Sequence, residues 1–91
     1  MATVKVTVEL DVIDLSEAHN DPVTGRHVDN LQGLLKAAAN STGNDDFDPE
    51  EYDGTANQPT RRALRRFKEK YDLRDKFICD GPAWERLIEF P

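Results

Sequence analysis

Side chains that commonly carry out chemistry are few in this chain. It has two histidines, His19 and His27, and one cysteine, Cys79. His19 lies two residues before Asp21 in a predicted loop, and no third ligand is apparent for a zinc site. Cys79 has no histidine nearby in the sequence and, as a single cysteine, cannot form an internal disulfide. We therefore interpret it as a small buried apolar residue. We therefore predict a protein with no catalytic activity and no metal or other cofactor.

An acidic run, DDFDPEEYD at residues 45–53, gathers six carboxylates. Carboxylate oxygens are the ligands that Ca²⁺ prefers, but the run lacks the glycine and the final glutamate of an EF-hand loop. A solvated loop is the favoured interpretation and a Ca²⁺ site the alternative. The segment Asp48–Glu51 could instead cap a short additional helical turn.

Four arginines form a second charged feature. Arg61 and Arg65, and likewise Arg62 and Arg66, are four residues apart, so on a helix they would form two adjacent ridges. Such a surface could bind phosphate or the carboxylates of a partner. It could equally pair with the acidic part of its own chain, including the 45–53 run.

Charge is distributed unevenly over the 91 residues, whose net charge is −6. Residues 1–54 hold 3 basic and 12 acidic side chains, whereas residues 55–91 hold 9 and 6. The acidic half disfavours non-specific nucleic-acid binding by the whole chain. No apolar run is long enough to span a membrane, and the N-terminal pattern is not that of a signal peptide. We therefore expect synthesis in the cytoplasm and no membrane partner.

Three helices are expected to position these side chains. Apolar residues at helical spacing predict helices over 26–40 and 60–73, and a last helix over 81–90. Thr60 is expected to cap the second helix, and Asp80 or Gly81 the third. On the second helix, Lys68 and Lys70 are expected to lie with the arginines on the polar surface. The residues expected to interlock as the core are Leu31, Leu35, Leu64, Phe67, Trp84 and Leu87, with Ile88 also pointing inward.

The segment TVKVTVELDV, residues 3–12, has the alternation of a β-strand with one dry and one wet face. Its apolar face consists of Val4, Val6, Val8, Leu10 and Val12. Residues 13–25 are predicted to be a loop, and KFIC at 76–79 could form only a very short strand. Because three helices offer no partner of matching length, we expect the strand to pair with another chain.

Three stretches resemble the motifs of one family. GRHVDNLQGLL, from residue 25, has the spacing G-x-x-V-x-x-L-Q-x-x-L. DGTANQPTRRALRRFKEKYDL, from residue 53, resembles D-G-x-x-G-x-x-T-x-x-A-V-x-x-F-Q followed by a leucine, and GPAWERL, from residue 81, resembles G-P-x-T-W-x-x-L. In this order they resemble the peptidoglycan-binding domain, a three-helix module common on bacterial and phage cell-wall hydrolases. The resemblance covers about residues 25–88.

The resemblance implies a mainly α fold: a three-helix bundle at 25–91, preceded by a strand arm and loop at 1–24. Gly25 and Gly54 are expected to form turns, and Gln32 is expected to bond backbone in a loop rather than a ligand. In place of the family's aromatic-Gly-Pro, the chain has Ala56-Asn57-Gln58, so a ring suited to stacking on a sugar is missing there. The acidic loop is also longer than in the family.

Two functions are consistent with these patterns. The first is a non-catalytic docking protein that binds a protein partner, or identical subunits, through the strand arm, for example as a capsid decoration or tail protein of a phage virion. The alternative is a peptidoglycan-binding module acting with a separate hydrolase, in which the four arginines could contact wall carboxylates. A third arrangement, in which residues 3–12 fold back over the helices, is also open.

Overall fold

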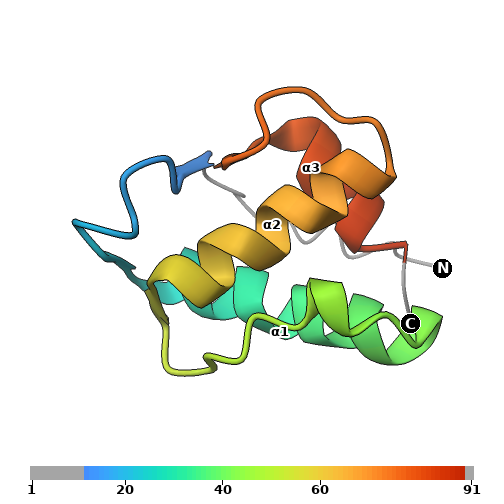
Figure 1. Cartoon of the computed structure of the whole chain (residues 1–91), viewed down its shortest axis with the longest axis horizontal. Helices are drawn as coiled ribbons and strands as arrows, with labels where there is room; N and C mark the ends of the chain where they lie inside the picture. Colours follow the sequence, from blue (N-terminus) through green and yellow to red (C-terminus); the bar gives the residue numbers. More distant parts are fainter. Residues whose placement is uncertain (1–11, 90–91) are drawn as a thin grey trace, which may run out of the picture.

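The computed structural model describes residues 12–89 (Figure 1). These residues form three α-helices, a 3-10 turn and four strands of two residues each. The helices are α1 (Arg26–Thr42), α2 (Gln58–Lys70) and α3 (Gly81–Leu87), and the 3-10 turn is η1 (Asp45–Phe47). The strands are β1 (Ile13–Asp14), β2 (Val23–Thr24), β3 (Thr55–Ala56) and β4 (Ile78–Cys79). The prediction of a mainly helical domain with three helices is therefore confirmed.

Two glycines set the limits of α1, the helix that contacts both α2 and α3. Gly25 precedes it with φ of 137°, and Gly43 follows it in the left-handed conformation with φ of 69°. The N–H of Gly43 donates to the carbonyl oxygen of Ala39, which satisfies one of the orphan carbonyls at the helix end. The expected turn at Gly25 is present, and the helix extends two residues beyond its predicted end.

The segment predicted to be a loop at 13–25 contains two strands, so that prediction is wrong. β1 pairs antiparallel with β4, and β2 pairs antiparallel with β3. The N–H of Leu15 continues the first ladder by donating to the carbonyl oxygen of Phe77 (2.7 Å). Strands of two residues carry too little alternation to be recognised in a sequence.

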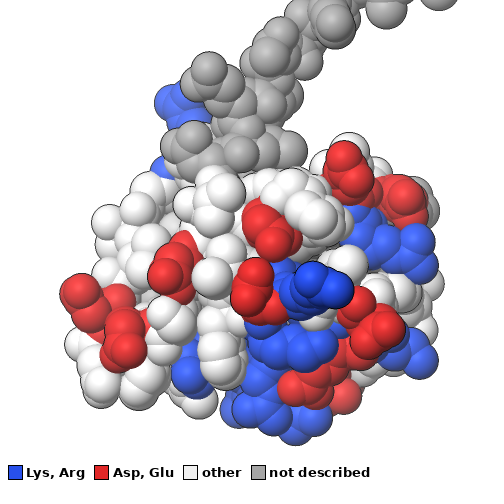
Figure 2. Space-filling model, turned by 90° about the horizontal axis from the view of Figure 1, so that it is seen from above, with Lys and Arg blue, Asp and Glu red and all other residues white. Residues whose placement is uncertain are grey.

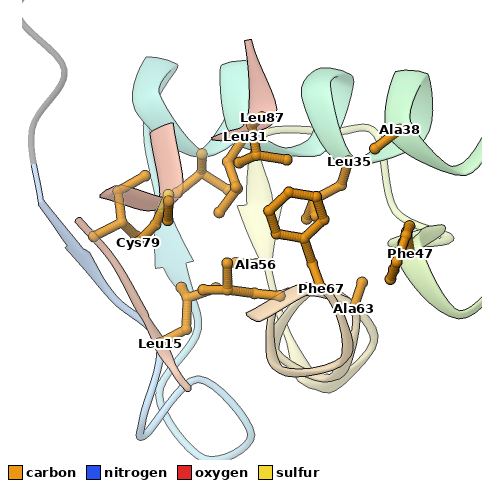
Figure 3. Close-up of a cluster of buried hydrophobic side chains, with 14 of the residues drawn as sticks. Leu15, Leu31, Leu35, Ala38, Phe47, Ala56, Ala63, Phe67, Cys79 and Leu87 are labelled. Carbon is orange, nitrogen blue, oxygen red and sulfur yellow. The ribbon is translucent and has the colours of Figure 1, made fainter. Parts of the chain in front are cut away.

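The core lies between the three helices and also takes in the β1–β4 sheet (Figure 3). All six residues predicted to interlock there are at most 2% exposed, which confirms that prediction. Ile88 does not join them: α3 ends at Leu87, and Ile88 follows it with 59% of its surface exposed. The expectation that Ile88 points inward is therefore wrong.

Residues that precede Gly25 also contribute to the core. Ile13 is 5% exposed, and Leu15 and Ala18 are 0% and 1% exposed. In Figure 3 Leu15 lies beside Cys79, on the side of the core formed by the β1–β4 sheet. Residues 13–24 thus contribute side chains to this core.

Candidate functional site

The β1–β4 ladder ends where the predicted strand arm joins the domain. Ile13 lies opposite Cys79, so the next residue of the arm, Val12, would lie opposite Asp80. There the chain turns into α3, and the Asp80 carboxylate accepts a hydrogen bond from the N–H of Ala83 (3.3 Å) as the helix N-cap. Within the described residues the ladder therefore ends at this point, because β4 ends at Cys79 and the chain enters α3.

The apolar alternation changes phase at this junction. In the predicted arm the apolar residues have even numbers, whereas the buried residues of the β1 region are Ile13 and Leu15. Val12, the last apolar residue of the arm, is 65% exposed. Since a shift of one residue moves a strand's side chains to the opposite face, the arm's apolar face is out of phase with the domain core. The other predicted contact residues, Val4, Val6, Val8 and Leu10, lie outside the described residues.

Lys68 fixes the end of β4. Its side chain is fully buried, and its ammonium group donates to the carbonyl oxygens of Asp75 (2.9 Å) and Ile78. It also lies 3.3 Å from the Asp80 carboxylate. The expectation that Lys68 covers the polar surface of the helix is therefore wrong. Lys68 lies four residues after the buried Leu64, on the same face of α2, and this spacing could have indicated that Lys68 is buried.

Three of the four predicted arginines have partners within the chain, two of them outside α2. The Arg61 guanidinium stacks 3.8 Å from the ring centre of Phe77, and Arg65 pairs with Glu69 at 2.9 Å. Arg62 pairs with Glu50 of the acidic run at 3.3 Å. For Arg62 this is the intramolecular alternative that the sequence left open.

Arg62 and Arg66 also line a pocket of about 350 Å³ opposite the acidic run. Its other lining residues are Asp45, Asp46, Asp48 and Glu50. Figure 2 shows that, on the face seen from above, basic side chains are interleaved with acidic ones rather than forming an unbroken basic patch. This arrangement reduces the positive potential that an anionic partner would encounter.

A network of hydrogen bonds centred on Gln32 holds the loop before α2. The Gln32 side chain is fully buried, donates to the carbonyl oxygen of Thr55 (3.0 Å) and accepts from the N–H of Gly54 (2.9 Å). It also donates to the Thr60 hydroxyl (3.1 Å), which itself donates to the Glu51 carboxylate (2.7 Å). The expectation that Gln32 bonds backbone in a loop is confirmed, and Gly54 has the expected positive φ of 76°.

The start of α2 differs from the prediction. The helix begins at Gln58, so Thr60 lies inside the first turn and is not its N-cap. Asn57 occupies the cap position without a side-chain cap bond, and its own N–H donates to the Glu51 carboxylate (3.0 Å). Glu51 therefore bridges two groups at this end of α2, and places a negative charge where the helix dipole favours it.

An open pocket of about 470 Å³ lies beside this network. It lies where the start of α1 meets the loop before α2, and Tyr52, 52% exposed, is the one aromatic residue among the described residues that line it. The lining residues are Thr24, Gly25, Arg26, Asp29, Tyr52, Asp53, Gly54 and Thr55. The sequence motifs indicated the two glycines of this pocket but not Tyr52, which precedes the Asp-Gly turn instead of following it.

Tyr52 is held by Asp48 and Lys36. The Tyr52 hydroxyl donates to the Asp48 carboxylate, and the Lys36 ammonium lies 2.8 Å from the same carboxylate. Both hydrogen bonds lower the pKa of Asp48, to about 2, and the bond from Lys36 has the larger effect. The same carboxylate raises the pKa values of Lys36 and Tyr52. The ring is thus anchored although it is exposed.

Cys79 is fully buried, and burial raises the pKa of its thiol to about 12.

Within residues 12–89, no three histidine, cysteine or acidic side chains converge as a metal site would require. No helix of the described part is long and apolar enough to cross a membrane.

Comparisons with protein-family models, with curated proteins and with solved structures each found no match for this chain.

Proposed function

We propose that this protein is a non-catalytic docking protein that attaches to a larger assembly through residues 3–12. The observation that carries this proposal is the end of the β1–β4 ladder at Ile13, where β4 turns into α3. In the sequence, the strand pattern occupies the ten residues before that point, residues 3–12. A strand needs a neighbour for its backbone N–H and C=O groups, and β4, with two residues, is too short to supply one along ten residues.

The phase change at Val12 supports the same proposal. An arm whose apolar side chains continued the phase of Ile13 and Leu15 could extend the domain core, but this arm has the opposite phase. Its apolar face, Val4 to Val12, is therefore suited to a second surface. In β-augmentation the backbone supplies affinity and the alternate side chains supply specificity. A role as a virion accessory protein is the form of this proposal that the sequence resemblance favours.

The test compares the full chain with a variant lacking residues 2–12, by gel filtration of extracts of cells that produce it. We expect the full chain in a complex larger than a monomer and the truncated chain at monomer size. Circular dichroism and urea unfolding of the purified variant control for the fold. Equal elution of the two folded proteins would contradict the proposal.

The pocket beside Tyr52 favours a second candidate function, binding to peptidoglycan. An exposed, anchored ring next to polar groups and an Asp-Gly turn is a suitable surface for a sugar, because a ring can stack on its apolar face. The motif resemblance points to the same ligand, and Tyr52 supplies a ring that the Ala56-Asn57-Gln58 segment lacks.

A pull-down on purified cell-wall sacculi tests this second candidate. We expect the protein to be retained at moderate salt, Tyr52→Phe to retain binding because the ring remains, and Tyr52→Ala to lose it. Tyr71→Ala removes a different aromatic ring, which packs against the core outside the pocket, and this variant should retain binding as long as it folds. Absence of retention of the unmodified protein would exclude this function.

A further inference from the structure

We propose that Asp53 is a site of isomerisation to isoaspartate, and that Gln32 suppresses this reaction by holding the N–H of Gly54. The chain contains two Asp-Gly pairs, Asp53-Gly54 and Asp80-Gly81. Such pairs are prone to this reaction, because glycine has no side chain to hinder attack by its own backbone nitrogen. Asp53 is exposed, so the water that completes the reaction can reach it.

The reaction needs no reagent other than water. The backbone nitrogen of Gly54 gives up its proton to solvent and attacks Cγ of the Asp53 carboxyl group. The N–Cγ bond forms, one carboxyl oxygen leaves as water, and the product is a five-membered succinimide ring. Water then opens this ring at either carbonyl. Opening at Cγ restores aspartate, whereas opening at the main-chain carbonyl leaves the chain running through Cγ, which is isoaspartate.

The attacking nitrogen is held in place in the folded protein. The N–H of Gly54 donates to the side-chain oxygen of Gln32 (2.9 Å), and Gln32 is fully buried. The carbonyl oxygen of Gly54 accepts from the N–H of Gly25 (3.1 Å), and the next residue belongs to β3, which pairs with β2. Ring closure requires rotation about the Cα–C bond of Asp53, which would carry the Gly54 N–H away from Gln32. This hydrogen bond must therefore break before the nitrogen can attack, and a buried polar group left without its partner is unfavourable.

Asp80-Gly81 is restrained through its carboxylate instead. One oxygen of Asp80 accepts a hydrogen bond from the first turn of α3 (3.3 Å) and lies 3.3 Å from the Lys68 ammonium group. Within the described residues the Asp53 carboxylate has no ion pair and accepts one hydrogen bond, from the backbone N–H two residues later (3.0 Å). Since the carboxylate of Asp53 is held so lightly, its protection depends on the bond between Gly54 and Gln32.

Isoaspartate at this position would change the loop before α2. It adds one carbon to the main chain, and so would displace Gly54 from its partners Gln32 and Gly25. Asp53 and Gly54 both line the pocket beside Tyr52, whereas the β1–β4 ladder takes no part in it. The inference is therefore independent of docking through residues 3–12.

The test measures isoaspartate at residue 53 while the protein is stored at neutral pH and physiological temperature. Peptide mapping by chromatography and mass spectrometry separates the isoaspartate form from the aspartate form. The first comparison is with a synthetic peptide of residues 50–57, which contains the Asp-Gly pair but not Gln32. We expect the folded protein to react about tenfold more slowly or slower still, the factor that one ordinary hydrogen bond supplies. Equal rates in protein and peptide would overturn the proposal.

Gln32→Leu tests the residue to which the protection is assigned. We expect isoaspartate to form at residue 53 about tenfold faster in this variant than in the unmodified protein. Lys68→Met is the matched control, because it also removes a fully buried polar side chain but leaves the bond between Gly54 and Gln32 in place, so the rate at residue 53 should not change. Asp53→Glu should abolish the signal, since its ring would need six members. Equal acceleration by Gln32→Leu and Lys68→Met would show that a general loss of stability controls the reaction, and the inference would fail.

Discussion

Gln32 is the residue on which the loop before α2 depends most. Replacing it with Leu would leave the N–H of Gly54, the carbonyl oxygen of Thr55 and the Thr60 hydroxyl without this partner. Buried polar groups left unpaired cost about 1–3 kcal/mol each, so we expect Gln32→Leu to lower the free energy of unfolding by about 3 kcal/mol in total. Urea unfolding measures it, with the exposed Asn30→Leu on the same helix as the control. A loss no larger than that of the control would contradict the role given to the network.

Asp48 makes the stability of the folded protein depend on pH, in a direction that its lowered pKa defines. Its pKa is lowered from 3.8 to about 2 in the folded state, so the folded state favours the charged carboxylate. That stabilisation is complete above about pH 4 and is lost as the pH falls towards about 2. We expect Asp48→Asn to be less stable than the unmodified protein near neutral pH, and the difference to shrink on acidification through this window.

Urea unfolding at several pH values measures the Asp48 effect. Asp45→Asn, which changes an exposed carboxylate of the same acidic run, is the matched control and should show no difference that disappears in this way. A constant difference between Asp48→Asn and the unmodified protein from neutral to acid pH would show that the ion pair with Lys36 is not its source.

At the scale of elements, Lys68 joins α2 to β4 and to the start of α3. Truncating it to Met removes the donor to two carbonyl oxygens and the ion-pair partner of Asp80 while keeping an apolar side chain of similar length. We expect a loss of about 3 kcal/mol in the free energy of unfolding, because one partner of a buried charged network is removed. Lys70→Met, exposed on the same helix, is the control in the same urea titration. Equal stabilities would contradict this role.

The elements differ in how far their sequences predict them. The helices could be predicted because apolar residues recur at helical spacing over several turns, and the core residues followed from the same stripes. The strands β1 to β3 could not, since each has two residues and depends on a partner distant in the sequence, and only β4 lies in a segment, 76–79, that was indicated as a possible very short strand. Phe47 was missed because its acidic neighbours suggest a solvated loop, yet η1 buries its ring against Phe67.

The residues of the candidate sites were likewise predicted where the signal lies close by in the sequence, and missed where it depends on distant segments. Gln32 was interpreted correctly because its role follows from a motif with fixed spacing. Lys68 was not, because lysine is usually exposed and the three groups that it binds come from a later segment. The arginine ridges follow from spacing alone, but their partners, such as Phe77 for Arg61, depend on the tertiary fold.

For the whole molecule, the position at which the packed unit begins leads to a prediction about stability. No member of the core cluster among residues 12–89 precedes Ile13, so we expect removal of residues 2–11 to change the free energy of unfolding of the monomer by less than about 1 kcal/mol. Leu15→Ala, which creates a cavity inside this core, should lower it by about 2–5 kcal/mol.

Protein concentration separates the arm's effect on association from its effect on the fold. If the arm pairs two copies, association stabilises the folded state by mass action, and the melting temperature of the full chain should rise with concentration. The chain lacking residues 2–11 should melt at one temperature at all concentrations, because the core that it retains is complete within one copy. Differential scanning calorimetry over a hundredfold range of concentration measures both melting temperatures. A full chain whose melting temperature is independent of concentration, and equal to that of the truncated chain, would show that the arm adds no association in the purified protein.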